Sequence, residues 1–361
     1  MQGLELSRRF YMEAVRPILG RRFPRLEHAA ALIGPGSEVL GYDDEVSTDH
    51  HWGPRVQLFL GDLRPQPELD RTLARELPIE FAGFPTNFGP PDEVGVRLLE
   101  PVDAGPVAHR VETLVLHDFL VTGWGIDPLQ SLTVADWLAT PTERLLELTA
   151  GEVFVDTIGE LTDVRERLKW YPHDVWLLVM AGEWRRIAEL EHFVGRSGSR
   201  GDDVGSCLIA ASLVRTLMRL ALLQERRYPP YAKWLGTAYA ELRRPESSAL
   251  AEALAPGDWR ARERALAEAY SQAARRHNDL GVTDAVDPSI RRFHGRPFHV
   301  LGADRVEHAL RAAIKDPEVA TVEHAAVSVD VVSDNTELLS HPGLWRRLVG
   351  LWSPEEGRAL G

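Results

Sequence analysis

The chain has 361 residues, with 41 lysines and arginines against 54 aspartates and glutamates, which gives a formal net charge of −13. At about 150 residues per domain this length predicts two domains, and 44% hydrophobic residues suffice for a sizeable core. The negative charge argues against a protein that coats DNA, because such proteins are usually basic, but it leaves room for a local basic cleft.

The first part of the chain is predicted to be a mixed α/β domain. Apolar residues at three- and four-residue spacings indicate a helix from residue 5, and Pro24 interrupts it before a second short helix that ends at Leu32. The stretch 34–54 is dense in glycine, serine, aspartate and histidine and is expected to be a loop. Further along we expect a helix at 67–85 and strands at 55–60, 94–99 and 107–116.

After about residue 130 helical periodicity dominates and strand-like alternation almost vanishes. The Gly- and Pro-containing segment 125–133 is the expected boundary between a first domain, 1–130, and a helical domain, 131–361, which could subdivide near 245. A short strand pair is expected near 296–301 and 326–332. The expected helices are 135–148, 161–168, 172–193, 205–225, 231–242, 247–254, 259–278, 303–315 and 341–352.

Nothing in the composition indicates secretion or a membrane. The single cysteine, Cys207, cannot form an internal disulfide, and its apolar neighbours predict that it is buried. The first ten residues, MQGLELSRRF, lack the basic and apolar regions of a signal peptide. The apolar stretch 175–181 is far shorter than the ~20 residues that span a bilayer. We therefore expect a cytoplasmic protein.

The segment 34–54 is also the densest in residues that can do chemistry. It contains the pair Gly36-Ser37, whose small side chains would let backbone N–H groups approach a phosphate closely. The acids that follow could hold Mg²⁺, although acids in such a loop can equally form turns and helix caps. These acids and the two histidines beside them are Asp43, Asp44, Glu45, Asp49, His50 and His51.

The string GSEVLGYDDEVSTDHHWGPRVQLFL resembles the nucleotidyltransferase superfamily of the DNA polymerase β type. It is similar in particular to an uncharacterised bacterial branch, domain of unknown function 4037. The strings RLKWYPHDVWLLVMAGEWRRIAELEHFVGR and ERRYPPYAKWLGTAY also look like that branch, so the resemblance spans about residues 30–350. It implies an α+β nucleotidyltransferase-like domain with a short mixed sheet, followed by a mainly α-helical region.

The resemblance also implies roles for particular residues. Gly36 and Ser37 would grip the triphosphate, Asp49 would be the first metal-binding carboxylate, and Glu112 is the candidate for the third acid. His51 stands where the family has its second aspartate, and imidazole is a poorer ligand for Mg²⁺ than a carboxylate. The expected metal set is therefore Asp49, His51 and Glu112, binding Mg²⁺ or Mn²⁺.

The helical half offers further nucleotide-binding candidates. Arg215 and Arg219 are spaced to share one face of a helix, and Lys233 lies among tyrosine and tryptophan residues. In similar nucleotidyltransferases a helical domain supplies phosphate contacts and a wall on which a base stacks. The alternative is that these aromatic residues only pack between helices.

Three functions are open at this stage. The first is metal-dependent transfer of a nucleoside monophosphate from an NTP, with ATP as first choice, to a hydroxyl of a small molecule, a protein or an RNA end. The second, prompted by His51, is a nucleotide- or partner-binding protein on a decayed catalytic scaffold. The third is a metal-dependent phosphohydrolase, suggested by the dyad His117-Asp118. We expect a monomer or homodimer with no membrane and no general DNA binding.

Overall fold

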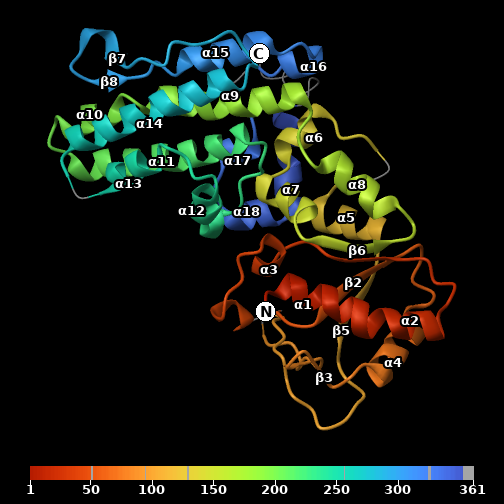
Figure 1. Cartoon of the computed structure of the whole chain (residues 1–361). Helices are drawn as coiled ribbons and strands as arrows, with labels where there is room; N and C mark the ends of the chain where they lie inside the picture. The colour runs from red at the N-terminus through yellow and green to blue at the C-terminus, as the bar shows by residue number, and fades with distance from the viewer. Residues whose placement is uncertain (50–51, 94, 128–129, 256, 324–326, 353–361) are drawn as a thin grey trace. The chain divides into compact units, whose positions relative to one another are not determined.

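The computed structural model describes residues 1–49, 52–93, 95–127, 130–255, 257–323 and 327–352 (Figure 1). The chain forms two compact units. The first comprises residues 1–131 and 144–169, and the second comprises residues 132–143 and 170–361. The expected fold class is confirmed, since the first unit holds a small mixed sheet and the second is almost entirely helical.

The first unit is built on a four-stranded sheet in the order β5-β2-β1-β6. β2 runs parallel to β5 and antiparallel to β1, and β1 is also antiparallel to β6. The register aligns Ala31 with Gln57 and Gln57 with Glu112, so these three side chains share one face of the sheet. The strands are β1 (Ala29–Leu32), β2 (Arg55–Leu60), β5 (Arg110–Val115) and β6 (Glu152–Asp156).

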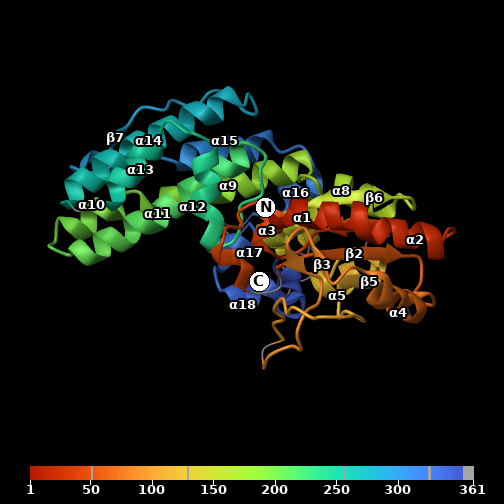
Figure 2. The same cartoon turned by 60° about the horizontal axis from the view of Figure 1, so that its bottom comes forward.

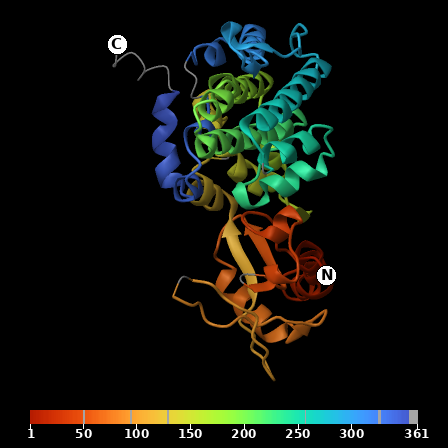
Figure 3. The same ribbon diagram turned by 90° about the vertical axis from the view of Figure 1, so that its left-hand side faces the viewer.

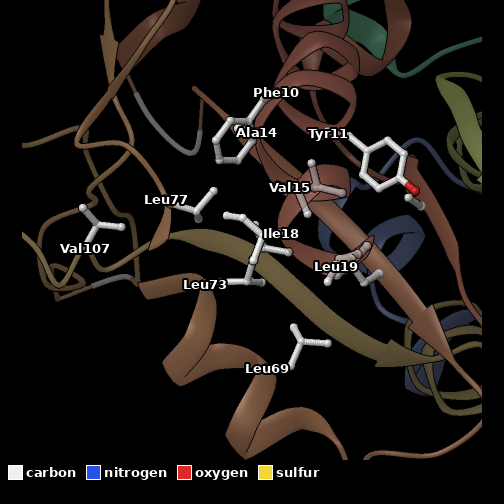
Figure 4. Packing of buried hydrophobic residues seen from close by; sticks show 14 residues of the cluster. Phe10, Tyr11, Ala14, Val15, Ile18, Leu19, Leu69, Leu73, Leu77 and Val107 are labelled. Atoms are coloured by element: carbon white, nitrogen blue, oxygen red, sulfur yellow. The ribbon is translucent and has the colours of Figure 1, made fainter. Parts of the chain in front are cut away.

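Apolar side chains cover the other face of the sheet. They come from the N-terminal helical run α1 (Gly3–Phe10), η1 (Tyr11–Val15, π-helical) and α2 (Arg16–Arg22), and from α4 (Gln66–Glu76). Figure 2 shows α1 and α2 lying over β2, and Figure 4 shows the side chains of these helices pointing toward one another. The cluster consists of Phe10, Tyr11, Ala14, Val15, Ile18, Leu19, Ala30, Val56, Leu58, Leu69, Leu73, Leu77, Val107 and Val111.

Strand β1 replaces the second short helix that the sequence predicts. All four of its residues are buried, because β1 lies between β2 and β6 and has both faces covered. A strand buried on both faces has no polar alternation, and its three alanines are strong helix formers, so the pattern favours a helix. The prediction of a helix ending at Leu32 is therefore wrong.

The other predictions for the first unit are confirmed in part. The strand at 55–60 is β2, the strand at 107–116 contains β5, and the helix at 67–85 is α4 as far as Glu76. The strand at 94–99 is wrong: among its described residues only Leu99 forms a bridge, with Phe88. Strand β6 was not expected. The remaining elements are α3 (Ser37–Leu40), η2 (Val46–Asp49), β3 (Glu80–Phe81), β4 (Phe84–Pro85), α5 (Leu116–Trp124), α8 (Glu160–Leu168) and the part of α7 (Thr142–Thr149) from Arg144 onward.

The second unit is a bundle in which α9 packs against α11 and α15, and α14 packs against α11 and α13. The green and cyan helices of this unit lie against one another in Figures 1 and 3. Its longer helices are α9 (His173–Leu190), α11 (Asp203–Gln224), α12 (Ala232–Glu241), α13 (Ser247–Leu254), α14 (Trp259–Asp279) and α15 (Asp304–Ala313). Its shorter ones are α6 (Val134–Ala139), α10 (Phe193–Gly198), α16 (Pro317–Ala320), α17 (Val329–Val332), α18 (Thr336–Ser340), α19 (Pro342–Trp345) and η4 (Arg346–Leu351).

Most predicted helices of this half are confirmed, but the expected helix 341–352 is the short α19 followed by the 3-10 helix η4, and two further details differ. The expected helix 135–148 is two helices, α6 and α7, because Pro141 disfavours helical geometry at Thr140. The expected strand pair is also different. β8 (His299–Val300) pairs with β7 (Arg291–Arg292), and the described part of 326–332 contains the helix α17 instead.

Helix α11 is long and apolar enough to cross a membrane by length and composition, but 56% of its most apolar window is buried, as in a core helix. Its exposed face carries Val204 and Leu208, which are 73% and 68% exposed. Cys207 lies on the same stretch and is exposed. The prediction of a buried cysteine is therefore wrong, because the apolar neighbours on this face are themselves uncovered.

His277 is a buried histidine in the core of the helical unit. It belongs to α14, is 0% exposed, and its Nε2 lies 2.8 Å from the hydroxyl of Thr283. Its ring meets Trp184 edge to face. Burial lowers the pKa of His277 from 6.5 to about 4, because a charged imidazole would lose its hydration there.

This pKa predicts a loss of stability in weak acid. In the unfolded chain His277 binds a proton as the pH falls below 6.5, whereas in the folded chain it stays neutral until about pH 4. The free energy of unfolding therefore decreases as the pH falls between these two values. Between pH 7 and pH 5 we expect the wild type to lose about 2 kcal/mol more than His277→Gln. Urea unfolding of both proteins at the two pH values measures this difference, and equal losses would contradict it.

Candidate functional site

The Gly36-Ser37 pair lies in the turn that follows β1. Gly34 and Gly36 have φ values of +96° and +148°, which favour glycine. A Cβ atom on Gly36 would lie 2.7 Å from Oε2 of Glu38, so a larger residue would displace that carboxylate. Ser37 is half-buried and begins the short helix α3. The turn thus packs closely against the Glu38 carboxylate.

A buried ion pair lies beside this turn. Glu38 belongs to α3, Arg55 is the first residue of β2, and their side chains are only 7% and 12% exposed. An Nη2–H of Arg55 donates to Oε1 of Glu38. Removing one partner of such a pair costs about 3–5 kcal/mol, since the other charge is left buried. The pair therefore fixes α3 relative to the start of β2.

Glu112 lies on the neighbouring strand β5. Its side chain is 38% exposed, and its Oε1 accepts hydrogen bonds from Nε and Nη2 of Arg110 at 3.0 and 2.5 Å. The parallel register places Glu112 beside Gln57 of β2. The buried amide of Gln57 in turn bonds both to the N–H and to the carbonyl of Ile33, at 2.9 and 3.1 Å. Gln57 thus ties the end of β1 to the strand beside Glu112.

The acids between α3 and β2 form structural contacts. Asp43 accepts hydrogen bonds from the backbone N–H of Gly3 at 2.7 Å and from the indole of Trp52 at 3.0 Å. Asp44 accepts from the backbone N–H groups of Val46 and Ser47, both at 3.0 Å, at the start of η2. These two residues act as a tether and a helix cap, which is the alternative that the sequence left open.

The other predicted metal ligands fall partly outside what the structure describes. Asp49 ends η2, and the description of this residue covers its backbone only. His50 and His51 lie outside the described residues. The assignments of Asp49 and His51 as metal ligands therefore stay predictions.

The described residues supply one member of the predicted metal set. No group of three or more histidines, cysteines or acids that could hold a metal occurs among them. Glu112 offers a half-exposed carboxylate, which is the donor type that Mg²⁺ and Mn²⁺ prefer. Two carboxylates and one imidazole would form a chemically suitable set for Mn²⁺ and a weaker one for Mg²⁺.

Arg219 of the helical unit lies in a buried ionic network. Its Nε donates to Oε1 of Glu183 at 2.9 Å, and its Nη2 lies 3.4 Å from Oδ1 of Asp330. Thr142 also donates to Asp330, from its backbone and from its hydroxyl. Burial raises the pKa of Glu183, and the charge of Arg219 opposes that rise. This arrangement gives Arg219 a structural task, and its proposed contact with a nucleotide stays a prediction.

Arg215 and Lys233 are more accessible. Arg215 is 39% exposed and forms an ion pair with Asp334. Lys233 is exposed, and its Nζ lies 4.7 Å from the ring centroid of Trp234. Arg215 lies one helical turn from Arg219 on α11, as the sequence indicates. Arg215 and Lys233 could both reach a ligand at the surface of the helical unit.

The dyad His117-Asp118 lies on α5. Nδ1 of His117 is 3.3 Å from Oδ1 of Asp118, and its Nε2 is 3.9 Å from a carboxylate oxygen of Asp127. The residues described around it provide no metal-capable group. Among the described residues, therefore, no further ligands complete a metal site around this dyad, and the phosphohydrolase hypothesis gains no support there.

Three charged residues of this site were not found from the sequence: Glu38, Arg55 and Arg110. A sequence pattern could have identified the two arginines. Both strands begin with Arg, an apolar residue and a second polar residue, as RVQ in β2 and RVE in β5. Because alternate residues of a strand share a face, this pattern predicts a polar patch at the matching ends of two paired strands.

The turn at Gly36 gives a testable consequence. In Gly36→Ala the new Cβ would push the Glu38 carboxylate away from Arg55 and would also strain a positive φ. We expect the free energy of unfolding to fall by about 1–3 kcal/mol. Urea denaturation measures this, with Gly20→Ala as control.

Gly20 suits this purpose because it lies in α2 and a Cβ there would meet no atom within 4 Å. Alanine at Gly20 should leave stability equal or raise it by about 0.5–1 kcal/mol. A Gly36→Ala protein as stable as Gly20→Ala would contradict the close packing of the turn.

Comparison with known proteins gives three findings. Residues 137–235 match the model of a family described as "Domain of unknown function (DUF4037)". Among solved structures, the chain is similar to a nucleotidyltransferase-like protein from Exiguobacterium sibiricum 255-15, with 13% sequence identity and a TM-score of 0.35. That alignment covers 83% of this chain and 88% of the other. No curated protein matches the chain.

Proposed function

We propose that this chain, whose residues 137–235 match the DUF4037 family model, is a nucleotidyltransferase. In the reaction, a hydroxyl oxygen of an acceptor attacks the α-phosphorus of a nucleoside triphosphate. A new bond forms between that oxygen and the α-phosphorus, and the bond from the α-phosphorus to the bridging oxygen breaks. Pyrophosphate leaves with the bonding electrons, and a base takes the hydroxyl proton.

One observation carries this proposal: the glycine turn after β1 and the polar starts of β2 and β5 occur at the same end of the sheet. β1 ends where β2 begins, because the two are antiparallel, and β5 begins beside β2, because these two are parallel. Gly36, Arg55 and Glu112 therefore belong to one neighbourhood of the first unit. A backbone turn, cations and a carboxylate are the groups that a triphosphate and its metal need.

Each residue has a distinct task in the proposed reaction. The backbone around Gly36 and the hydroxyl of Ser37 would bind the β- and γ-phosphates and hold the α-phosphorus for in-line attack. Glu112, with Asp49 and His51, would hold a divalent ion, Mg²⁺ or Mn²⁺. When bound, such an ion neutralises phosphate charge and orients the triphosphate. Arg110 now donates to Glu112, so it would have to release that carboxylate.

The acceptor is proposed as a chemical class. A small hydroxylated molecule is the first choice, because a net charge of −13 favours cationic acceptors. A protein hydroxyl or an RNA end is the second, and the nucleotide is ATP in the first instance. We further propose that the protein works in the cytoplasm as a monomer or homodimer, without membrane or general DNA binding.

A second function has its own supporting observation. Glu112 is already neutralised by Arg110, which is the arrangement expected of a scaffold that binds a nucleotide without a catalytic metal. The histidine at position 51 points the same way. Metal-dependent NTP turnover gained by His51→Asp would support this second function. Loss of turnover in the same variant would support the enzyme with an altered metal set.

The enzyme proposal is tested with two variants of glutamates on strands of the first unit. Glu112→Gln keeps the shape of the side chain and removes its charge, so metal-dependent NTP turnover should fall at least about 100-fold. Glu80→Gln, on the exposed strand β3, should leave turnover unchanged. Pyrophosphate release in Mg²⁺ and in Mn²⁺ measures both variants.

Asp49→Ala should likewise abolish metal-dependent nucleotide binding or turnover. Mass spectrometry of the wild type after incubation with each NTP would identify the bound nucleotide and any self-labelling. Turnover that survives both Glu112→Gln and Asp49→Ala would overturn the assignment of this site.

A further inference from the structure

A cavity of about 600 Å³ opens at one end of the helical unit. Its wall is formed by α10, by the loop that follows it and by the β7–β8 hairpin, which Figure 1 shows at the same end of the bundle. Three arginines line it, Arg196, Arg200 and Arg296, together with two serines and two phenylalanines. Asp202 is the acid among the lining residues.

Among the described residues, the three arginines of the cavity have no carboxylate partner, unlike several other arginines of this unit. Arg219, Arg244 and Arg262 each form ion pairs with carboxylates. Within the described part of the chain, no ion pair involves Arg196, Arg200 or Arg296. Three uncompensated guanidinium groups around one cavity leave a net positive charge in a protein that is strongly negative as a whole.

The single acid in the wall offsets only part of this charge. Oδ1 of Asp202 accepts a hydrogen bond from the backbone N–H of Gly205 at 2.8 Å and so caps α11. A Cβ on Gly205 would lie 2.1 Å from the other carboxylate oxygen, which shows that the carboxylate is turned against this helix. Asp202 keeps its negative charge, but one carboxylate against three guanidinium groups leaves the cavity with a net positive charge.

Close packing holds the wall in place. A Cβ on Gly195 would lie 2.6 Å from the ring of Phe298, and one on Gly198 would lie 2.2 Å from Trp259. These contacts press α10 against the hairpin and against the start of α14. The arginines of α10 and of the hairpin thus project from backbones that are fixed relative to each other, which reduces the entropy lost when they bind a common ligand.

The charges act together on a neighbouring group. His192 precedes α10, and its ring packs on Phe293 of the hairpin at 4.1 Å between centroids. Burial lowers the pKa of His192, and the charges of Arg196 and Arg296 lower it further. The two arginines, 100 positions apart in the chain, therefore contribute to one local positive potential.

We propose that this cavity binds a diphosphate group, either as inorganic pyrophosphate or as part of a nucleoside diphosphate. One guanidinium group can donate two parallel hydrogen bonds to two phosphate oxygens. The positive charges of three such groups offset most of the roughly three to four negative charges of a diphosphate. The hydroxyls of Ser197 and Ser199 add donors, and Phe193 and Phe298 give one wall an apolar surface. This proposal does not depend on the nucleotidyltransferase reaction.

The test is calorimetric titration of the full chain with sodium pyrophosphate in EDTA. EDTA removes divalent metal ions, so the proposed metal-dependent site of the first unit would not bind pyrophosphate under these conditions. The wild type should bind one pyrophosphate. Arg196→Gln and Arg296→Gln should each weaken binding about tenfold or more, since each removes a charged hydrogen bond. Absence of binding by the wild type, or variants that bind pyrophosphate as tightly as the wild type, would overturn the proposal.

Two matched variants separate this site from other effects. Arg275→Gln changes an exposed arginine of α14 that lies 16 residues, or about 24 Å of helix, beyond Trp259. It should bind as the wild type does, and so should Glu112→Gln. Equal weakening in Arg275→Gln would indicate general charge attraction and overturn the assigned site. If the protein proves not to be a nucleotidyltransferase, the predicted affinities of the wild type and the variants for pyrophosphate stay the same.

A second titration distinguishes the two sources of the diphosphate. A nucleoside diphosphate that binds tighter than pyrophosphate, with the gain lost in Phe193→Ala, identifies a nucleotide. Equal affinity for the two identifies pyrophosphate. An oligoribonucleotide that binds more tightly than either would overturn the assignment to a compact ligand.

Discussion

The first unit depends on the burial of strand β1 between two antiparallel neighbours. All four of its residues are buried, and Gly151 packs so closely that a Cβ there would lie 2.1 Å from the carbonyl oxygen of Leu32. Gln57 then holds the next residue, Ile33, by both of its backbone groups. Because β1 cannot shift, the glycine turn after it begins at a fixed place, and this turn is where the candidate site is built.

The polar residues of the site follow from this constraint. One face of the sheet is filled by apolar side chains of α1, α2 and α4, so charged residues of β2 and β5 can only lie on the other face. There Arg55 pairs with Glu38 of α3, and Arg110 pairs with Glu112. These pairs stabilise the site without a ligand, and any ligand or metal must compete with Arg110 for Glu112.

The sequence predicts the fold class and the amphipathic helices well, because α13 and α14 each present a periodic apolar face. It misses β1 and β6, since the run Ala29–Leu32 has no alternation and the partner Glu152–Asp156 lies among helices. Gly36 was found from the small residues of its loop, and Glu112 was found through a resemblance. Arg55 and Glu38 were missed because their pairing depends on tertiary contacts. Arg196 and Arg296 lie over the rings of Phe193 and Phe293 and form no ion pair among the described residues, which is likewise visible only in three dimensions.

The central claim is that the turn at 34–37 binds the phosphates of a nucleotide and that Glu112 at the start of β5 holds its metal ion. Hydrogen exchange of backbone amides, measured by mass spectrometry on the full chain with ATP and Mn²⁺, tests it most directly. The account predicts added protection in peptides that cover residues 34–40 and 110–115, and its loss on adding EDTA. Protection confined to residues 193–202, or no change in 34–40, would contradict it.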